Sequence, residues 1–79
     1  MTLRKLDPVV LERDLPEHGL RKGDLGAVVD IHDETRLEVE FVRPSGSTQA
    51  VVELDSADVR PVNEEDLLAV RSASARGAA

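Results

Sequence analysis

The chain has 79 residues, a formal net charge of −6 at pH 7, no cysteine and one aromatic side chain, Phe41. This length allows one small domain, because a chain of this size buries only about 60% of its unfolded surface on folding, and the missing cysteines exclude a disulfide framework and thiolate chemistry. No stretch reaches the roughly 20 apolar residues of a membrane-spanning helix, so we expect a cytoplasmic protein with an aliphatic core and a low stability of its own.

The first element that we expect is a short strand at residues 9–13, within the segment PVVLER. A loop follows it, and Pro16 and Gly19 interrupt any regular structure there. This loop is the longest connection that we expect between strands.

Three glycines lead out of this loop, in the segment GLRKGDLGAVVDI. Gly19, Gly23 and Gly26 are spaced four and three residues apart. A phosphate-binding loop requires such glycines between a strand and a helix, whereas these glycines lead into a strand. We therefore predict structural corners: Gly23 and Asp24 form a turn with a positive φ, and Gly26 lies where two backbones approach closely.

The middle of the chain alternates between apolar and polar residues with a period of two, which is typical of strands with one buried face. Three such runs lie at about residues 25–32, 36–41 and 49–54, and short links at 32–35 and 43–48 connect them. Short links favour consecutive antiparallel strands with one face in water. The sets that alternation places on one face are Leu25, Ala27, Val29 and Ile31, then Leu37, Val39 and Phe41, then Ala50, Val52 and Leu54; the opposite sets include Val28, Asp30 and His32, then Arg36, Glu38 and Glu40, then Gln49, Val51 and Glu53.

The segment after these runs predicts one more strand. DSAD, residues 55–58, indicates a tight turn or a single 3₁₀ turn, and VRPV, residues 59–62, is a last strand that Pro61 restricts to a sheet edge or to the strand end. Five short strands, a long first loop and a near-helical turn before the last strand predict an all-β domain over residues 1–62. The expected architecture is a small SH3-like five-stranded barrel.

Residues 63–71 are expected to form a short C-terminal helix. Asn63 is a suitable N-cap, the three acidic residues after it suit the positive end of a helix dipole, and Arg71 suits the negative end. A helix this short is not stable alone, so it must pack on the barrel, pair with another molecule or fray. Residues 72–79 contain no core-forming side chains, and we expect a disordered tail.

One segment resembles a known structural element. RKGDLGAVVDI, residues 21–31, is similar to the KOW-type element of SH3-like barrels in ribosomal proteins and transcription elongation factors. Over about residues 7–62 the chain also resembles a family of short bacterial proteins of unknown function, because DLPEHGLRKGDLGAVV precedes EVEFV, a glycine-containing turn, a further strand and VRPV. The resemblance implies a fold and no particular chemistry, since that family has no assigned activity.

Candidate metal-binding and catalytic residues are few. His32, Asp33 and Glu34 form the tightest cluster of potential ligands, and His18 could join it across the fold. A metal requires three or four converging donors, and adjacent residues in a turn seldom point the same way, so we predict a solvated turn, no metal and no cofactor. The two glutamates of the second run lie about 7 Å apart on one strand face, but no nucleophile lies beside a base, and we predict no catalytic site.

The charge distribution indicates the kind of partner. Residues 25–60 contain eight acidic and three basic side chains, whereas residues 1–24 contain five of each. An acidic surface attracts basic partners and repels phosphate backbones. We therefore predict a non-enzymatic interaction module that binds a protein partner through Glu38, Glu40 and Glu53 or through an exposed strand edge. A basic toxin neutralised by a small immunity protein or antitoxin fits this size and charge.

Two other functions stay open. A KOW-like protein associated with RNA or the ribosome would use Arg21, Lys22 and Arg43, although RNA recognition usually needs aromatic platforms and the net charge opposes it. Small barrels of this kind are also accessory subunits of larger enzyme complexes. A homo-oligomer is compatible with either function, because a second copy adds the burial that so small a core lacks.

Overall fold

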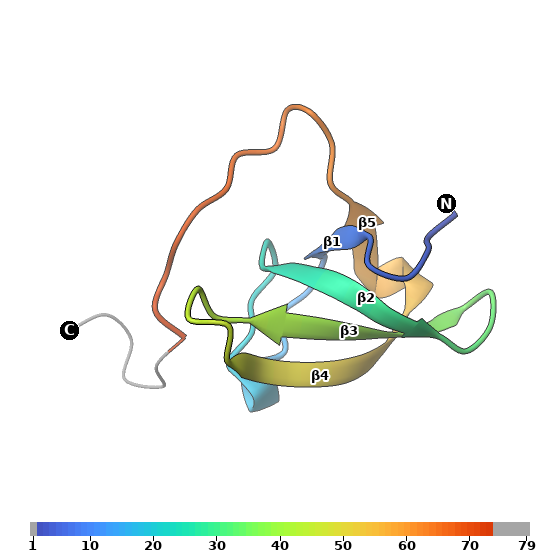
Figure 1. The fold of residues 1–79 in the computed structure, drawn as a ribbon, viewed down its shortest axis with the longest axis horizontal. Coiled ribbons are helices and arrows are strands. Elements are labelled where there is room, and N and C mark those ends of the chain that lie inside the picture. Colours follow the sequence, from blue (N-terminus) through green and yellow to red (C-terminus); the bar gives the residue numbers. More distant parts are fainter. Residues whose placement is uncertain (1, 74–79) are drawn as a thin grey trace.

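One antiparallel sheet in the order β4-β3-β2-β1-β5 forms the body of the molecule (Figure 1). The computed structural model describes residues 2–73. Within that range, no helix has the length and apolar character that crossing a membrane requires. The elements in chain order are β1 (Pro8–Leu11), the 3₁₀ turn η1 (Pro16–His18), β2 (Leu25–Ile31), β3 (Arg36–Val42), β4 (Thr48–Asp55), the 3₁₀ turn η2 (Ser56–Asp58) and β5 (Val59–Pro61).

Strands β2, β3 and β4 form three consecutive antiparallel strands, as the short links predict. In the first link, His32 N donates a hydrogen bond to Arg36 O (2.9 Å). In the second, Arg43 N donates to Ser47 O (2.8 Å), and Gly46 supplies the positive φ of 93° that this tight turn needs. The turn residues in the sequence were therefore sufficient to predict that β2, β3 and β4 are consecutive neighbours in the sheet.

Strand β1 lies between β2 and β5, and Val9 is opposite Pro61 on β5. Pro61 thus belongs to an edge strand, where its missing N–H removes no hydrogen bond to a further strand, as predicted. The predicted end of β1 is wrong by two residues. The strand ends at Leu11, and Arg13 Nε instead donates to Asp58 Oδ1 (3.0 Å).

The sheet does not close into the predicted barrel. Strands β4 and β5 are its two edges, and they are not paired with each other in the described part of the chain. Strand β5 has only three residues, and its proline lacks an N–H, so it offers little to a closing ladder. Leu15 and Leu20, from the loop after β1, complete the core instead; each donates its backbone N–H to the carbonyl oxygen of the other (2.9 and 3.1 Å).

A single aliphatic core holds the sheet together. The predicted inward positions of β3 are confirmed, since Leu37, Val39 and Phe41 are buried, and those of β4 are confirmed for Val52 and Leu54, with Ala50 partly buried beside them. Burial of a Val, Leu or Phe side chain contributes about 1.5–3 kcal/mol, so this cluster dominates the stability. Val10 is also buried but lies outside the core cluster. The cluster consists of Val9, Leu11, Leu15, Leu20, Val28, Leu37, Val39, Phe41, Val52, Leu54 and Val59.

Strand β2 departs from the predicted alternation because it contains a bulge. Its register shifts between Val28, which is opposite Val39, and Asp30, which is opposite Glu38. Val28 is fully buried, whereas Leu25 is 45% exposed on the other face. An extra residue in a strand changes the face of every residue that follows it. The bulge therefore leaves Leu25 and Asp30 on the same outer face, which simple alternation does not predict.

The predicted C-terminal helix is wrong: residues 63–71 contain no helix. Asn63 caps only one turn, in which its Oδ1 accepts a hydrogen bond from Glu65 N and its backbone O accepts one from Asp66 N (both 3.1 Å). A helix of this length depends on packing of its apolar side, and here its apolar residues remain exposed. The predicted tail begins at Ser72, and residues 74–79 lie outside the described residues.

Candidate functional site: an acidic row across the sheet

Three carboxylates lie side by side across the middle strands of the sheet. Asp30 on β2 is opposite Glu38 on β3, and Glu38 is opposite Glu53 on β4. All three lie on the face that points away from the core, and we call them the acidic row. Like charges directly opposite each other destabilise a sheet, so the row is held against its own repulsion by the neighbouring core residues and by nearby cationic side chains.

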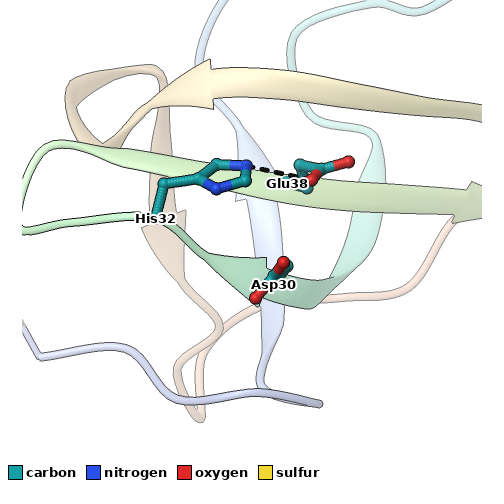
Figure 2. Close-up of side chains that lie close together, drawn as sticks. All are labelled: Asp30, His32 and Glu38. Atoms are coloured by element: carbon teal, nitrogen blue, oxygen red, sulfur yellow. Dashed lines mark hydrogen bonds and ion pairs between the residues drawn. The ribbon is translucent and has the colours of Figure 1, made fainter.

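His32 lies beside the centre of the acidic row, as Figure 2 shows for its contact with Glu38. Its Nε2 atom is 2.9 Å from Glu38 Oε1 and 3.7 Å from Glu53 Oε2. The ring thus connects carboxylates that come from two different strands. Asp30 lies on β2, the strand that leads into His32, and Figure 2 shows it below the His32–Glu38 pair.

The two outer carboxylates of the row each have a cation from the same chain. Arg36 Nη2 is 3.0 Å from Glu53 Oε1, and Lys5 Nζ is 3.8 Å from Asp30 Oδ1. The hydrogen bond to Glu53 raises the pKa of Arg36 above its usual value. Because these side chains are largely exposed, such pairs contribute little stability. What they show is that the row accepts guanidinium and ammonium groups at its surface.

The turn between β2 and β3 determines the position of His32. Asp33 Oδ1 accepts hydrogen bonds from Thr35 N (2.8 Å), Thr35 Oγ1 (3.0 Å) and Arg36 N (3.0 Å). The hydrogen bond from the backbone of Thr35 is the main cause of the lowered pKa of Asp33. Asp33 is therefore engaged in the turn, and the adjacent residues His32, Asp33 and Glu34 do not act as one cluster.

A metal ion could be held by residues from different strands. Asp30, His32 and Glu38 each place one ligand atom within 4.8 Å of the others. One imidazole nitrogen and two carboxylate oxygens form a donor set that divalent transition metals accept. His18, which the sequence suggested as a further ligand, lies in η1 and does not belong to this group.

The three predicted partner-binding glutamates are only partly brought together. Glu38 and Glu53 face each other in the row, whereas Glu40 lies one step along β3, opposite apolar side chains. Glu40 Oε2 accepts a hydrogen bond from Thr48 Oγ1 (2.7 Å). Asp30 takes the third place in the row. The alternation placed Asp30 on the same face as Glu38 and Glu53, but it did not name Asp30 as a site residue, because the register that puts it opposite Glu38 depends on the bulge in β2.

The predicted basic residues lie near the opposite end of the outer face. Lys22 N donates to Asp14 Oδ1 (2.8 Å) in the turn before β2, and Arg43 Nη1 donates to Ser47 Oγ (3.2 Å) in the turn after β3. Together with Arg21, their side chains line one hollow of about 1500 Å³. The hollow is of mixed charge, since Asp24, Glu40 and Asp66 line it as well, but arginine and lysine are in excess there on a chain whose net charge is −6.

The three glycines of the first loop have different structural roles. Gly19 ends η1 with a φ of 69°, and Gly23 has a φ of 98° in the turn before β2. Gly26 has no positive φ, but a Cβ atom there would lie 2.5 Å from Val39 Cγ1 and 2.9 Å from Phe41 Cε1. Gly26 thus makes room for core side chains of the neighbouring strand.

Comparison with known proteins identifies a family and no activity. No curated protein and no solved structure is significantly similar to the chain. Residues 5–61, which contain all five strands and the whole acidic row, match a family model. The match covers well over half of the chain. The chain therefore belongs to the family described as Domain of unknown function (DUF4926).

Proposed function

We propose that this protein is a non-enzymatic interaction module that binds a basic protein partner through the acidic row. The observation that carries the proposal is the direct juxtaposition of Asp30, Glu38 and Glu53 on three neighbouring strands. Such a juxtaposition lowers stability but favours the approach of a cationic surface. The three carboxylates already lie side by side in the free protein, so binding does not have to bring them together.

The contacts that the row already makes indicate the chemistry of the partner. Arg36 and Lys5 occupy its two ends, while His32 is the only cation-forming group beside Glu38 in the described chain. An arginine of the partner would displace His32 and bind Glu38 and Glu53 together, because a guanidinium group donates two parallel hydrogen bonds. The free edge of β4 lies beside Glu53 and suits an extended basic segment.

The partner class that fits best is a basic toxin, with this chain as its immunity protein or antitoxin in the bacterial cytoplasm. We also propose that the sheet is an open variant of the SH3-like fold of KOW type. Support comes from the long loop after β1, the three consecutive strands β2 to β4, and η2 before β5. Small size and negative charge support a neutralising role, since such proteins work by covering a basic surface.

Partner capture with matched variants tests the proposal. The wild-type chain, Glu38→Gln/Glu53→Gln and the control Glu12→Gln/Glu17→Gln serve as baits, and both variants lose two negative charges. We expect a basic protein on the wild-type and control baits, absent from the row variant and released at high salt. With that protein purified, the row variant should lower the association rate about tenfold. Equal association rates for all three chains would overturn the proposal.

RNA binding is the second candidate function. It is favoured by one observation: Arg21, Lys22 and Arg43 line the same hollow, and none of the three forms an ion pair within residues 2–73. A low-salt mobility shift with ribosomal RNA tests it. A shift that Arg21→Ala/Lys22→Ala abolishes supports RNA binding, and no shift with the wild-type chain removes it.

A further inference from the structure

A second surface lies beneath the C-terminal segment, apart from the acidic row. Figure 1 shows this segment leaving β5, arching away from the sheet and returning toward it. We call residues 62–73 the strap. The hollow of about 1500 Å³ lies between the strap and the outer faces of β1, β2 and β3.

The strap is anchored at both ends by arginine–carboxylate pairs. Near its start, Arg60 Nη1 and Nη2 donate to Asp66 Oδ2 (2.9 Å) and Oδ1 (2.8 Å). Near its end, Arg71 pairs with both carboxylate oxygens of Asp24, with 2.9 Å from Nε to Oδ1, and donates to Gly19 O (3.1 Å). Two bidentate pairs of this kind define the path of the strap over the sheet.

Between its anchors the strap exposes apolar side chains. Leu67, Leu68 and Val70 are 93%, 79% and 91% exposed. On the sheet side of the same hollow, Leu25 on β2 and Val42 on β3 are 45% and 55% exposed. Two apolar surfaces of one molecule thus line one hollow, and neither covers the other. Contiguous exposed apolar surface of this kind marks an interaction site.

The charges around the hollow indicate which occupant fits. Arg21 and Lys22 are exposed at its rim, and within residues 2–73 neither forms an ion pair. Elsewhere in the lining, Arg60 and Arg71 are paired with Asp66 and Asp24, and Glu40 is the remaining carboxylate against Arg21, Lys22 and Arg43. The excess of charge without an ion pair is therefore positive, and the complementary ligand is a segment with acidic residues followed by apolar ones. The strap has this pattern, because the exposed Glu64 and Glu65 precede the sequence DLLAV. A second copy of the chain therefore offers the occupant that the hollow requires.

We propose that two copies form a symmetric dimer in which the strap of each copy covers the apolar outer face of the other. A twofold axis makes this contact twice. Five side chains that each bury about 100 Å² give roughly 1,000 Å² in total over both copies, which is the lower limit for a specific interface. The dimer is therefore weak and concentration-dependent. The acidic row stays outside the contact and is free to bind its partner.

Sedimentation velocity over a wide concentration range tests the dimer. The strap variant Leu67→Ser/Leu68→Ser and the sheet variant Leu25→Ser/Val42→Ser each remove one side of the contact. None of the four side chains belongs to the buried core, so we expect both variants to fold, which circular dichroism checks. We expect the dissociation constant to rise at least tenfold in either variant. The control Leu6→Ser removes a leucine that is 80% exposed outside the contact and should leave the constant unchanged.

Mixing and cross-linking experiments distinguish a strap that covers the hollow of a second copy from a strap that covers the hollow of its own chain. A mixture of the two serine variants should recover part of the dimer, because one of its two contacts survives in the mixed pair. The chain has no cysteine, so oxidation of mixed Leu68→Cys and Leu25→Cys chains should yield the mixed disulfide. A wild-type chain that is monomeric at every concentration overturns the proposal. So does an intrachain disulfide in the monomeric double-cysteine variant, or a dimer that neither serine variant weakens.

Discussion

Glu38 on β3 and Glu53 on β4 are directly opposite each other, and one imidazole lies next to both carboxylates: His32 Nε2 is 2.9 Å from Glu38 Oε1 and 3.7 Å from Glu53 Oε2. A sheet chosen for stability alone would avoid opposing like charges. The relationship therefore has two consequences that experiments separate, one for stability and one for partner binding.

The double variant Glu38→Gln/Glu53→Gln is expected to be more stable than the wild-type chain. Glutamine keeps hydrogen-bonding groups beside His32 and Arg36 while it removes the repulsion along the acidic row, which is worth up to about 1 kcal/mol in the free energy of unfolding. Urea unfolding at low and high ionic strength measures the change, which should shrink as salt screens the row. If the double variant instead lost more than about 1 kcal/mol in the free energy of unfolding, the ion pairs of the row would stabilise the fold by more than its repulsion destabilises it.

Gly26→Ala is expected to destabilise the chain although Gly26 has no positive φ. The new Cβ would meet Val39 Cγ1 at 2.5 Å and the ring of Phe41 at 2.9 Å, and both are buried side chains without room to move. Overpacking of this kind costs about 1–3 kcal/mol. Urea unfolding measures it, with Gly46→Asn as control, because Gly46 has open space around it and asparagine tolerates its positive φ. Equal stability of Gly26→Ala and the wild-type chain would show that β2 and β3 lie further apart.

Leu54→Ala is expected to leave much of the chain unfolded. Leu54 is among the largest fully buried side chains, and truncation of a buried leucine costs about 2–5 kcal/mol, which is comparable to the whole stability of a domain of this size. Circular dichroism during thermal and urea unfolding measures the loss. The exposed Leu6, which lies outside the proposed dimer contact, provides the control, since Leu6→Ala should change the free energy of unfolding by less than about 0.5 kcal/mol.

The first anchor of the strap is expected to open in acid. The hydrogen bonds from Arg60, and then that from the backbone of Asn63, lower the pKa of Asp66 to about 2. Since the unfolded value is about 3.9, the ionised carboxylate supports the anchor fully above about pH 4, and this support is lost as the pH falls through about 2.

Nuclear magnetic resonance tests this anchor through the side-chain carboxyl carbon of Asp66. Its titration should be centred near 2, and the methyl signals of Leu67 and Leu68 should shift over the same pH range. In Asp66→Asn these methyl signals should lose that pH dependence. A titration centred at the unfolded value would show that Arg60 and Asp66 are not paired in solution.

The parts of the fold that followed from the sequence depend on local rules. The alternation in β3 identified its buried residues, and the residues of the two short links placed β2, β3 and β4 next to one another. The capping box of η2, in which Asp55 accepts a hydrogen bond from Ala57 N (2.9 Å) and Asp58 accepts one from Asp55 N (3.1 Å), is also a local pattern. Such patterns act within a few residues, so a sequence shows them directly.

The parts that did not follow depend on contacts between distant residues. The bulge in β2 puts Asp30 into the acidic row, and no sequence signal indicates which residue of LGAVVDI is the extra one. The helix predicted at residues 63–71 was the reverse case: its local signals were correct, but Arg60 and Arg71 anchor an irregular strap instead. Tertiary contacts override the helix propensity of a segment this short.

By itself, then, the sequence determined an all-β domain with an aliphatic core, an acidic middle and three glycines at structural corners, because composition and period-two patterning are properties of the chain. Only the tertiary structure decided that the sheet stays open, that Asp30 joins Glu38 and Glu53, and that the strap arches over an apolar face. The physical reason is that strand register and burial arise from all contacts of the folded chain together, and they determine which charges and apolar side chains become neighbours.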